Sequence, residues 1–364
     1  MVDSLRHLKV WWTIINGVGS GMRLGRQVDQ LFRYYVYEVL QDEGLFEYLR
    51  EPRTFGQILA KFSYVDSDYT RELLNILVSD KNSVLTYQND LYRLNPEAQL
   101  PRLEKLVSRT DKRIHGFTLM AKGMTQYIPS RLRNNPIEFS DTFEQDGRQL
   151  LTRFDRTLGS RIYSTIRNAA FALLTNDDLE SLHGKSMLDV GCGSGRETAE
   201  LWLKLKGNIH IVAIDPVPSL LELATKNFED TLQQTDPAHP PLTADNTPRF
   251  ELASATHLPF EDNTFDAAFH SLVLHWTPDP RKAVSEIVRV LKPGGLVFGT
   301  QGTKPHLNPY FDIVIRTNEN THGFFWKEEF LRWYGEHGVE LEMITPVGIF
   351  KGHKPLTPPA SGRK

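Results

Sequence analysis

The chain has 364 residues and a formal net charge of −3, from 42 Lys and Arg against 45 Asp and Glu. This length suits two domains better than one, and the slightly acidic balance excludes the electrostatic footprint of a nucleic-acid-binding protein. No run of 18 apolar residues occurs, so we expect no membrane span. The single cysteine, Cys192, cannot form an internal disulfide, which indicates a reducing compartment and a cytoplasmic protein.

The amino-terminal part of the chain is predicted to form helices followed by one hairpin. Residues 28–40 carry apolar side chains at helical spacing. A capping box at Thr54 begins a second helix, and Asp68 is the expected N-cap of a third. Two short stretches of alternating residues then flank Asn89-Asp90, which predicts a hairpin. Helices followed by a two-stranded wing are typical of a winged helix.

A winged helix is commonly a reader of DNA, and this function has to be weighed. The third predicted helix would carry the base-reading side chains, and its polar residues are of both signs. They are Asp68, Arg71, Glu72, Asn75, Asp80 and Lys81. A set of mixed sign binds phosphates poorly, so the sequence favours a role other than DNA binding.

The most informative stretch is Met187–Gly195, where an apolar strand leads into an acidic residue and three glycines at alternate positions. Glycine has no Cβ and tolerates positive φ, so the backbone of such a turn can pass close to a ligand. A dinucleotide fingerprint would need a third glycine where Arg196 stands, and a P-loop would need a Gly-Lys-Ser/Thr sequence. Both of these classes of site are excluded.

The segments after the glycine turn alternate between strands and helices. Residues 209–214 predict a second strand, which ends at Asp215 and Pro216. A carboxylate at this place can accept hydrogen bonds from both ribose hydroxyls of a nucleotide; alternatively, Asp215 caps the helix that follows. Residues 250–255 and 265–271 predict the third and fourth strands, ahead of a helix and a fifth strand. The alternation is typical of an α/β protein.

Together these segments, over roughly residues 150 to 350, resemble the class I S-adenosylmethionine-dependent methyltransferases. The resemblance implies a Rossmann-like seven-stranded methyltransferase sheet, preceded by an N-terminal mostly helical winged-helix domain. It also implies S-adenosylmethionine as the cofactor, bound by the turn and by the ends of the strands. The residues expected to bind it are Asp189, Gly191, Cys192, Gly193, Asp215, Pro216, Ser254, Ala255 and His270.

Two of these positions leave alternatives open. The family usually has Asp where this chain has Ser254, so adenine recognition would be weaker, or would rest on the serine hydroxyl and the Ala255 amide. Cys192 is a potential reactive thiol, although a small residue that fills the glycine turn is the simpler interpretation.

A winged helix ahead of such a domain resembles the small-molecule O-methyltransferases of plants and bacteria, where it mediates dimerisation and closes the partner's pocket. The resemblance implies a homodimer and a hydrophobic acceptor methylated on oxygen; a carbon of a lipid, quinone or polyketide-like acceptor is the alternative. A winged-helix regulator that senses a ligand is the rival from another class. The expected domains are 1–104 for dimerisation, 105–175 as a helical linker contributing to the acceptor pocket, 176–354 for cofactor binding and catalysis, and 355–364 as a disordered tail.

The candidate catalytic base is His275, just after the fourth predicted strand. Histidine, with an unperturbed pKa of about 6.5, is the most frequent general base. In the O-methyltransferases a His-Asp-Trp segment carries the catalytic histidine, whereas this chain reads His-Trp-Thr-Pro-Asp. A packing or hydrogen-bonding role for His275 is therefore equally open. No metal-ligand spacing of histidines or carboxylates appears, so we expect no metal.

Overall fold

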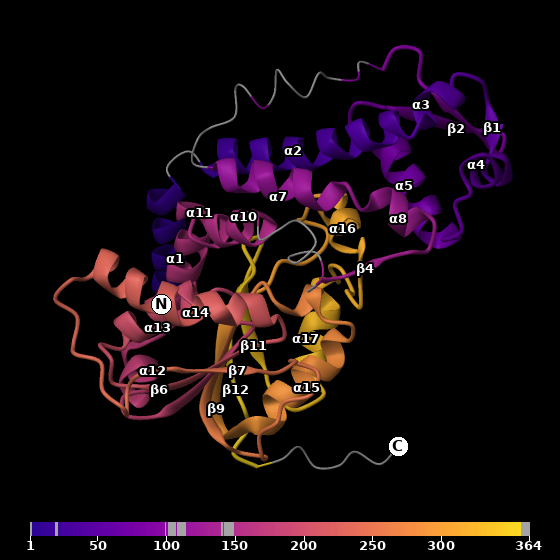
Figure 1. The fold of residues 1–364 in the computed structure, drawn as a ribbon. Helices are drawn as coiled ribbons and strands as arrows, with labels where there is room; N and C mark the ends of the chain where they lie inside the picture. The colour runs from indigo at the N-terminus through magenta and orange to yellow at the C-terminus, as the bar shows by residue number, and fades with distance from the viewer. Residues whose placement is uncertain are drawn as a thin grey trace. The chain divides into compact units, whose positions relative to one another are not determined.

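The computed structural model describes residues 2–18, 21–98, 114–139 and 149–357, with the single residues 100, 107 and 141. The chain divides into two compact units (Figure 1). The sheet unit comprises Met1–Gly21, Leu158–His306 and Phe324–Lys364. The helical unit comprises Met22–Thr157 and Leu307–Gly323. The division into consecutive domains that the sequence predicts stays a prediction, and most of its tail lies outside the described residues.

The sheet unit is built on seven strands in the order β11-β12-β9-β8-β5-β6-β7. Five of them run parallel: β5 (Ser186–Val190), β6 (His210–Asp215), β7 (Arg249–Leu252), β8 (Phe265–Ser271) and β9 (Leu291–Thr300). The last hairpin, β11 (Leu341–Ile344) and β12 (Ile349–His353), adds antiparallel to β9. This confirms the predicted seven-stranded sheet.

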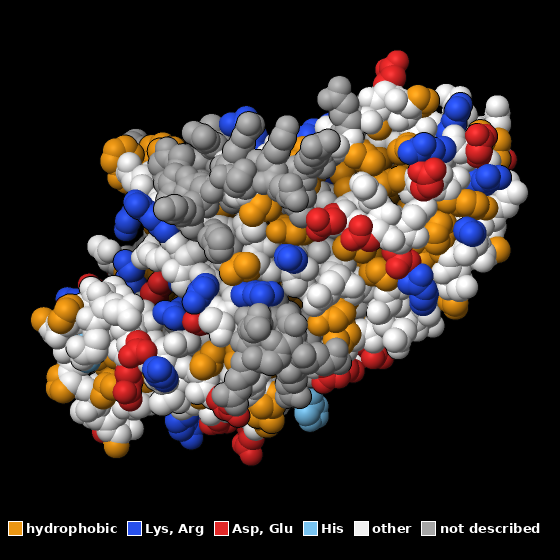
Figure 2. Space-filling model, turned by 45° about the horizontal axis from the view of Figure 1, so that its top comes forward, with side chains coloured by type: hydrophobic (Ala, Val, Ile, Leu, Met, Phe, Trp, Pro, Cys, Tyr) orange, Lys and Arg blue, Asp and Glu red, His pale blue; other side chains and the backbone are white. Residues whose placement is uncertain are grey.

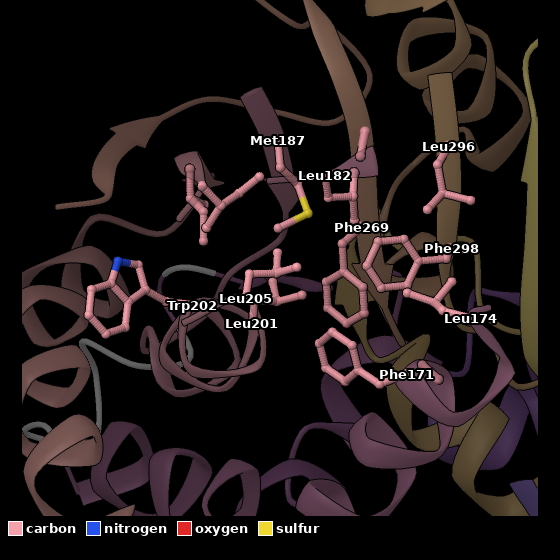
Figure 3. Close-up of a cluster of buried hydrophobic side chains, with 14 of the residues drawn as sticks. Phe171, Leu174, Leu182, Met187, Leu201, Trp202, Leu205, Phe269, Leu296 and Phe298 are labelled. Atoms are coloured by element: carbon pink, nitrogen blue, oxygen red, sulfur yellow. The ribbon is translucent and has the colours of Figure 1, made fainter. Parts of the chain in front are cut away.

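Helices cover both faces of this sheet, because its central strands are apolar on both sides. One face carries α1 (Val2–Val18), α11 (Arg161–Leu173), α12 (Asn176–Ser181), α13 (Arg196–Lys204) and α14 (Pro218–Thr235). The other carries α15 (Pro280–Val290) and α17 (Lys327–Gly335). On the first face Phe269 packs against Phe171 and Phe298, with ring centroids 6.4 and 5.1 Å away (Figure 3).

The helical unit begins with α2 (Gly21–Asp42), α3 (Leu45–Tyr48), β1 (Arg53–Thr54), α4 (Phe55–Phe62), α5 (Ser67–Ser79), β2 (Leu85–Gln88) and β3 (Leu91–Leu94). The three strands form a sheet in the order β1-β3-β2. The predicted hairpin turn is present, since Asn89 and Asp90 have φ of 51° and 61°, the left-handed pair that suits a two-residue hairpin. This succession of elements has the arrangement predicted for a winged helix.

The caps of α4 and α5 test two predictions. The capping box is confirmed, because the Gln57 amide donates to Thr54 Oγ1 and the Thr54 amide donates to Gln57 Oε1. The prediction for the next helix is wrong: its N-cap is Asp66, which accepts a hydrogen bond from the Tyr69 amide at 2.9 Å, and Asp68 lies in the first turn. The helix therefore begins two residues earlier than the polar pattern suggests, which places the buried Tyr69 and Thr70 in its first turn.

The remaining elements of the helical unit are α7 (His115–Thr125), α8 (Ile128–Leu132), β4 (Ile137–Glu138), α10 (Gln149–Leu158), α16 (Pro309–Ile315) and β10 (Asn318–Glu319). Strand β10 pairs with β4 in parallel. The predicted linker therefore contains several helices, although residues 108–113 and 142–148 lie outside the described part. Among the described residues, no helix has the length and apolar character that crossing a membrane requires.

Candidate functional site

The glycine turn joins β5 to α13 at the carboxyl edge of the sheet. Gly191, Gly193 and Gly195 have φ of 71°, 53° and 79°, a region that glycine adopts without strain. A Cβ added at Gly191 would lie 2.5 Å from the Val273 side chain, and one at Gly195 would lie 2.5 Å from the Ala224 carbonyl oxygen. Backbone conformation therefore favours glycine at all three positions, and close packing adds to this at Gly191 and Gly195.

Asp215 is buried at the end of β6 and is bonded to the glycine turn. Its Oδ2 accepts a hydrogen bond from the Gly193 amide at 3.0 Å, and its Oδ1 accepts one from the Val217 amide at 2.9 Å. The N-cap of α14 is Val217 itself, so the alternative role of Asp215 as the cap is wrong. Each carboxylate oxygen keeps capacity for a further hydrogen bond. Pro216, next in the chain, is exposed.

Asp189 supports the turn from beneath. It is buried near the end of β5, and its Oδ2 accepts a hydrogen bond from Thr198 Oγ1 at 2.7 Å. Thr198 belongs to α13. The bond therefore joins the strand before the glycine turn to the helix after it, which holds the turn between two fixed ends.

Three carboxyl groups surround this turn, and each has a raised pKa. Burial raises the pKa of Asp189 to about 8, with the charge of Glu197 adding to it. Burial likewise raises the pKa of Glu197 to about 7 and that of Asp215 to about 6. The hydrogen bonds from Gly193 and Val217 keep Asp215 the most acidic of the three. Buried carboxylates close together resist ionisation, so a bound cation would stabilise their charged forms.

One buried cation offsets part of this negative charge. Arg167 of α11 contacts Glu200 through two hydrogen bonds of 2.8 Å and lies 3.6 Å from Glu197. Sequence reasoning missed Arg167 and Glu197. Glu197 reads as an ordinary acidic residue in a first helical turn, and Arg167 lies on a helix that precedes β5. Their roles become visible only when α11 and α13 are packed together.

Cys192 fills the turn and is not a reactive thiol. It is buried in the core cluster on the α11 side of the sheet. Burial, with the charges of Asp215 and Asp189, raises the pKa of the Cys192 thiol well above its ordinary value. Because the thiolate is the reactive form, the simpler interpretation of this residue is the one that the geometry supports.

The loop after β7 begins beside Asp215, where the Ala253 amide donates to the Asp215 carbonyl oxygen at 3.3 Å. Ser254 Oγ lies 2.9 Å from Thr256 Oγ1 and accepts a hydrogen bond from the Thr256 amide. Ala255 is buried in the core cluster on the α15 side. Both residues predicted to lie near an adenine are therefore on a loop adjacent to the end of β6.

His270 lies in the core, away from the glycine turn. Its ring is buried against Phe350, with the centroids 4.7 Å apart, and its Nε2 lies 2.8 Å from the Tyr334 hydroxyl. Burial lowers the pKa of His270 to about 3. Successive strand residues point to opposite faces, and His270 points toward α17 whereas Phe269 points toward α11. We therefore leave His270 out of the cofactor site proposed below.

His275 lies in a short 3₁₀ helix, η2 (Leu274–Trp276), after β8. Its ring is buried and stacked on Phe324, with the centroids 4.2 Å apart. Its Nδ1 lies 3.3 Å from Gln301 Nε2, and the same Nε2 donates to the Gly302 carbonyl oxygen at 3.0 Å. The amide nitrogen of Gln301 thus faces His275, so Nδ1 accepts the hydrogen bond and the neutral ring carries its proton on Nε2. Burial lowers the pKa of His275 to about 3.

A family model for the methyltransferase domain matches residues 188–299, from β5 to β9. The chain contains a class I S-adenosylmethionine-dependent methyltransferase domain. This domain implies S-adenosylmethionine as the cofactor, and the residues around the turn suit it. The sulfonium and ammonium groups are both cationic, and they would stabilise the charged forms of Asp189, Glu197 and Asp215, which burial disfavours.

Curated relatives match about a third to a half of the chain. A demethylmenaquinone methyltransferase of Clavibacter sepedonicus is 29% identical over 166 residues, which is 46% of this chain and 58% of that protein. An O-methyltransferase of Aspergillus nomiae is 33% identical over 116 residues, which is 32% of this chain and 46% of that protein. The chain thus spans about half the length of these relatives.

Solved structures share the fold over nearly the whole chain. The CMeT domain of the citrinin polyketide synthase has a TM-score of 0.72 at 14% identity, covering 98% of this chain and 96% of its own. The CurJ carbon methyltransferase has a TM-score of 0.68 at 14% identity, covering 97% and 99%. An O-methyltransferase family 2 protein of Planctomyces limnophilus, in complex with apigenin, has a TM-score of 0.52 at 17% identity, covering 91% and 96%.

Proposed function

We propose that the chain transfers a methyl group from S-adenosylmethionine to a hydrophobic small molecule, at a carbon made acidic by neighbouring carbonyl groups. The observation that carries this proposal is the state of His275: buried, weakly basic and protonated on Nε2 through its bond with Gln301. Such a group suits hydrogen-bond donation to an oxygen of the acceptor better than proton removal from it.

The cofactor would be held by the residues around the glycine turn. The backbone of Gly191, Cys192 and Gly193 would lie along one side of the cofactor. Asp215 and Pro216 lie at the end of β6, where the ribose would be placed. On the next loop Ser254 and Ala255 would contact the adenine, while Asp189 would hold the turn without touching the cofactor. When bound, S-adenosylmethionine supplies an electrophilic methyl group on its positively charged sulfur.

The acceptor must present a nucleophilic atom, and this requirement separates carbon from oxygen. An alcohol needs a base to remove its proton, and a histidine with a pKa of about 3 is a poor base at neutral pH. A carbon between two carbonyl groups ionises much more readily, and its enolate carries negative charge on oxygen. His275 would stabilise that oxygen by donating from Nε2, as a preorganised hydrogen-bond donor does in an oxyanion hole.

The surroundings of His275 fit a flat or apolar acceptor. The His275 ring is stacked on that of Phe324, and the ring of Trp276, the next residue in η2, has its centroid 5.4 Å away. Both carbon methyltransferases named above share the fold from end to end, which supports the proposal at the level of architecture.

Transfer to oxygen is the second candidate. The relative from Aspergillus nomiae is an O-methyltransferase, and the Planctomyces limnophilus protein was solved with apigenin. A phenol of this type is acidic enough that a weak hydrogen-bonding histidine would suffice. The regulator hypothesis has less support, because the net charge is −3 and acidic side chains occur among the basic ones on the face seen in Figure 2.

Methyl-labelled cofactor and a panel of acceptors test the proposal. The panel would contain 1,3-dicarbonyl thioesters, hydroxylated quinones and flavonoid phenols, and carbon-13 nuclear magnetic resonance would report whether the new methyl is bonded to carbon or oxygen. We expect turnover of the dicarbonyl acceptors with a carbon-bound methyl. Turnover confined to phenols would favour the second candidate, and sequence-specific DNA binding in a gel shift at physiological salt, without turnover, would favour the regulator.

A further inference from the structure

A cavity lies among the helices that cover one face of the sheet unit. Its volume is about 370 Å³, near the lower end of the range for small-molecule sites. The described residues that line it belong to α1, α11, α12 and α13, all within the sheet unit. Helices α1 and α11 lie side by side there (Figure 1), and a Cβ on Gly17 would overlap the side chain of Thr165. We call this space the α1–α11 cavity.

Part of the lining of the α1–α11 cavity is apolar and firmly held. Phe171 and Ala172 of α11 are only 6% and 5% exposed, and Leu179 of α12 is half-buried. The ring of Phe171 also packs against those of Phe269 and Phe298, with centroids 6.4 and 5.8 Å away (Figure 3). This part of the lining can therefore take up a hydrocarbon group and remove it from water without rearranging the core.

Two lysines line the same cavity, and among its described lining residues none is acidic. Lys9 of α1 and Lys204, the last residue of α13, are both exposed. The Lys204 ammonium lies 5.9 Å from the centroid of the Phe171 ring, within cation–π range. Neither ammonium group contacts an acidic side chain in the part of the chain that the structure describes, whereas the ammonium of Lys292 lies 2.9 Å from Asp266. The cavity thus carries positive charge that no carboxylate of the protein neutralises.

The other polar side chains of the lining already use their donors on their own helices. Thr13 Oγ1 donates to the Lys9 carbonyl oxygen at 2.9 Å, and Thr165 Oγ1 donates to the Arg161 carbonyl oxygen at 2.7 Å. Asn168 Nδ2 donates to the carbonyl oxygen of Ser164 at 2.9 Å. The two ammonium groups are therefore the donors that this lining can offer to a ligand, which suits the two oxygens of a carboxylate better than the larger charge and three oxygens of a phosphate.

We propose that the α1–α11 cavity binds a small amphipathic carboxylate of about eight carbons. The hydrocarbon chain lies against Phe171, Ala172 and Leu179, and the carboxylate group lies near Lys9 and Lys204. Charge complementarity determines the sign of the ligand, and the apolar lining determines its body. A cavity of this volume accommodates such a molecule but not a macromolecule.

The α1–α11 cavity is separate from the proposed cofactor site. Glu197 lies beside the glycine turn at the start of α13, and Lys204 lies seven residues further on, about 10 Å along the helix. The carboxylate should therefore bind while the cofactor site is occupied. The proposal does not depend on methyl transfer, because a chain that binds the carboxylate but transfers no methyl group would leave it standing.

Isothermal titration calorimetry with octanoate tests the proposal on the full chain saturated with S-adenosylhomocysteine. We expect one site per chain with a Kd of about 0.1 mM, an ordinary affinity for a ligand of about ten non-hydrogen atoms. Octanamide, which has the same chain without the charge, should bind about 10-fold more weakly. Butyrate, which lacks four methylene groups, should also lose at least about 10-fold, since each buried methylene contributes up to about 4-fold.

Substitutions of the two lysines locate the site. Lys9→Gln and Lys204→Gln should each weaken octanoate binding about 3-fold, and the double variant about 10-fold, because each removes one exposed ion pair. Lys204→Arg keeps the charge and should bind like the wild type. Lys226→Gln is the matched control, since Lys226 is an exposed lysine of α14 outside the cavity. Thr13→Phe should block the cavity while both charges remain.

Unchanged melting temperature and S-adenosylhomocysteine binding confirm that each variant is folded. Three results would overturn the proposal. The first is no heat of binding up to about 5 mM octanoate. The second is octanoate binding of equal strength in the wild type, the double lysine variant and Thr13→Phe, which would place the ligand elsewhere. The third is binding of octyl phosphate at least 10-fold tighter than that of octanoate, which would assign the cavity to phosphate esters.

Discussion

Burial shifts pKa values in opposite directions at two neighbouring parts of the sheet edge. At the ends of β5 and β6 three buried carboxyl groups have raised pKa values. At the end of β8 and in the short helix η2 that follows it, two buried histidines have pKa values lowered to about 3. Burial favours the neutral form of the side chain in both places. At the ends of β5 and β6 it gives carboxyl groups whose charged forms a bound cation would stabilise. After β8 it gives His275, a neutral hydrogen-bond donor. The first suits the methyl donor and the second an acceptor.

Removing the donor at His275 gives the largest expected change. His275→Ala should lower kcat about 100-fold, the effect of losing one oxyanion-hole donor, with cofactor affinity unchanged. His275→Asn, which still offers an N–H, should recover part of that loss. The profile of kcat against pH should show no ascending limb caused by His275 between pH 5.5 and 8. An ascending limb that disappears in the alanine variant would show that His275 acts as a base, and would contradict its role as a neutral hydrogen-bond donor.

Substitution of Asp215 tests the proposed cofactor side of the sheet edge. Asp215→Asn keeps an oxygen for one of the two amides but removes the charge, and hydrogen bonds to a charged group contribute about 1.5–3 kcal/mol. We expect S-adenosylmethionine to bind about 30-fold more weakly, as measured by isothermal titration calorimetry. Asp266→Asn is the control, because Asp266 bonds Ser186 and Lys292 at the start of β8. Unchanged affinity in the Asp215 variant would remove this residue from the site.

The pH dependence of cofactor binding tests whether the carboxyl groups of Asp189, Glu197 and Asp215 respond to the charge of the cofactor. With pKa values of about 6 for Asp215 and about 7 for Glu197, both groups become charged as the pH rises from 5.5 to 7.5. Affinity for S-adenosylmethionine should therefore rise about 10-fold over this range. S-adenosylhomocysteine, whose sulfur is neutral, should gain less. Equal gains for the two ligands would show that the cluster does not respond to the sulfonium charge.

The stability of the ligand-free protein should fall as the pH rises from about 6.5 to 8, and this is the smallest expected effect. The folded pKa values of Asp189 and Glu197 are raised, so their contribution to stability is lost from their unfolded pKa near 4 upward, until the pH has passed about 8 and 7 respectively. The folded pKa values of His270 and His275 are lowered, so below about pH 6.5, where the unfolded histidines bind protons, they oppose this trend, and above it the carboxyl groups act alone. Scanning calorimetry should show a smaller loss of stability between pH 6.5 and 8 in Asp189→Asn than in the wild type.

The sequence predicted those parts of the site that are local in the chain. The glycine turn and Asp215 each follow an apolar strand, and parallel strands bring their ends together. Glu197, Arg167 and Gln301 could not be found this way, because each acts on a residue from another segment, as Gln301 of the loop after β9 acts on His275.

Errors in the fold predictions have the same origin. The alternative cap at Asp215 and the cap at Asp68 both depend on where a buried side chain forces a helix to begin. The direction of His270 depends on the alternation of β8, in which Phe269 faces α11 and His270 faces α17. Patterns of residue type show where helices and strands lie in the chain. Packing decides the residue at which a helix begins and the face of the sheet to which a strand side chain points.

Titration of the wild-type chain with S-adenosylmethionine at pH 7, repeated in two buffers of different ionisation enthalpy, tests the central claim most directly. The account predicts one saturable site per chain and a net release of protons, because a cation placed beside Asp189, Glu197 and Asp215 lowers their raised pKa values. Absence of binding, or binding with no change in protonation, would contradict it.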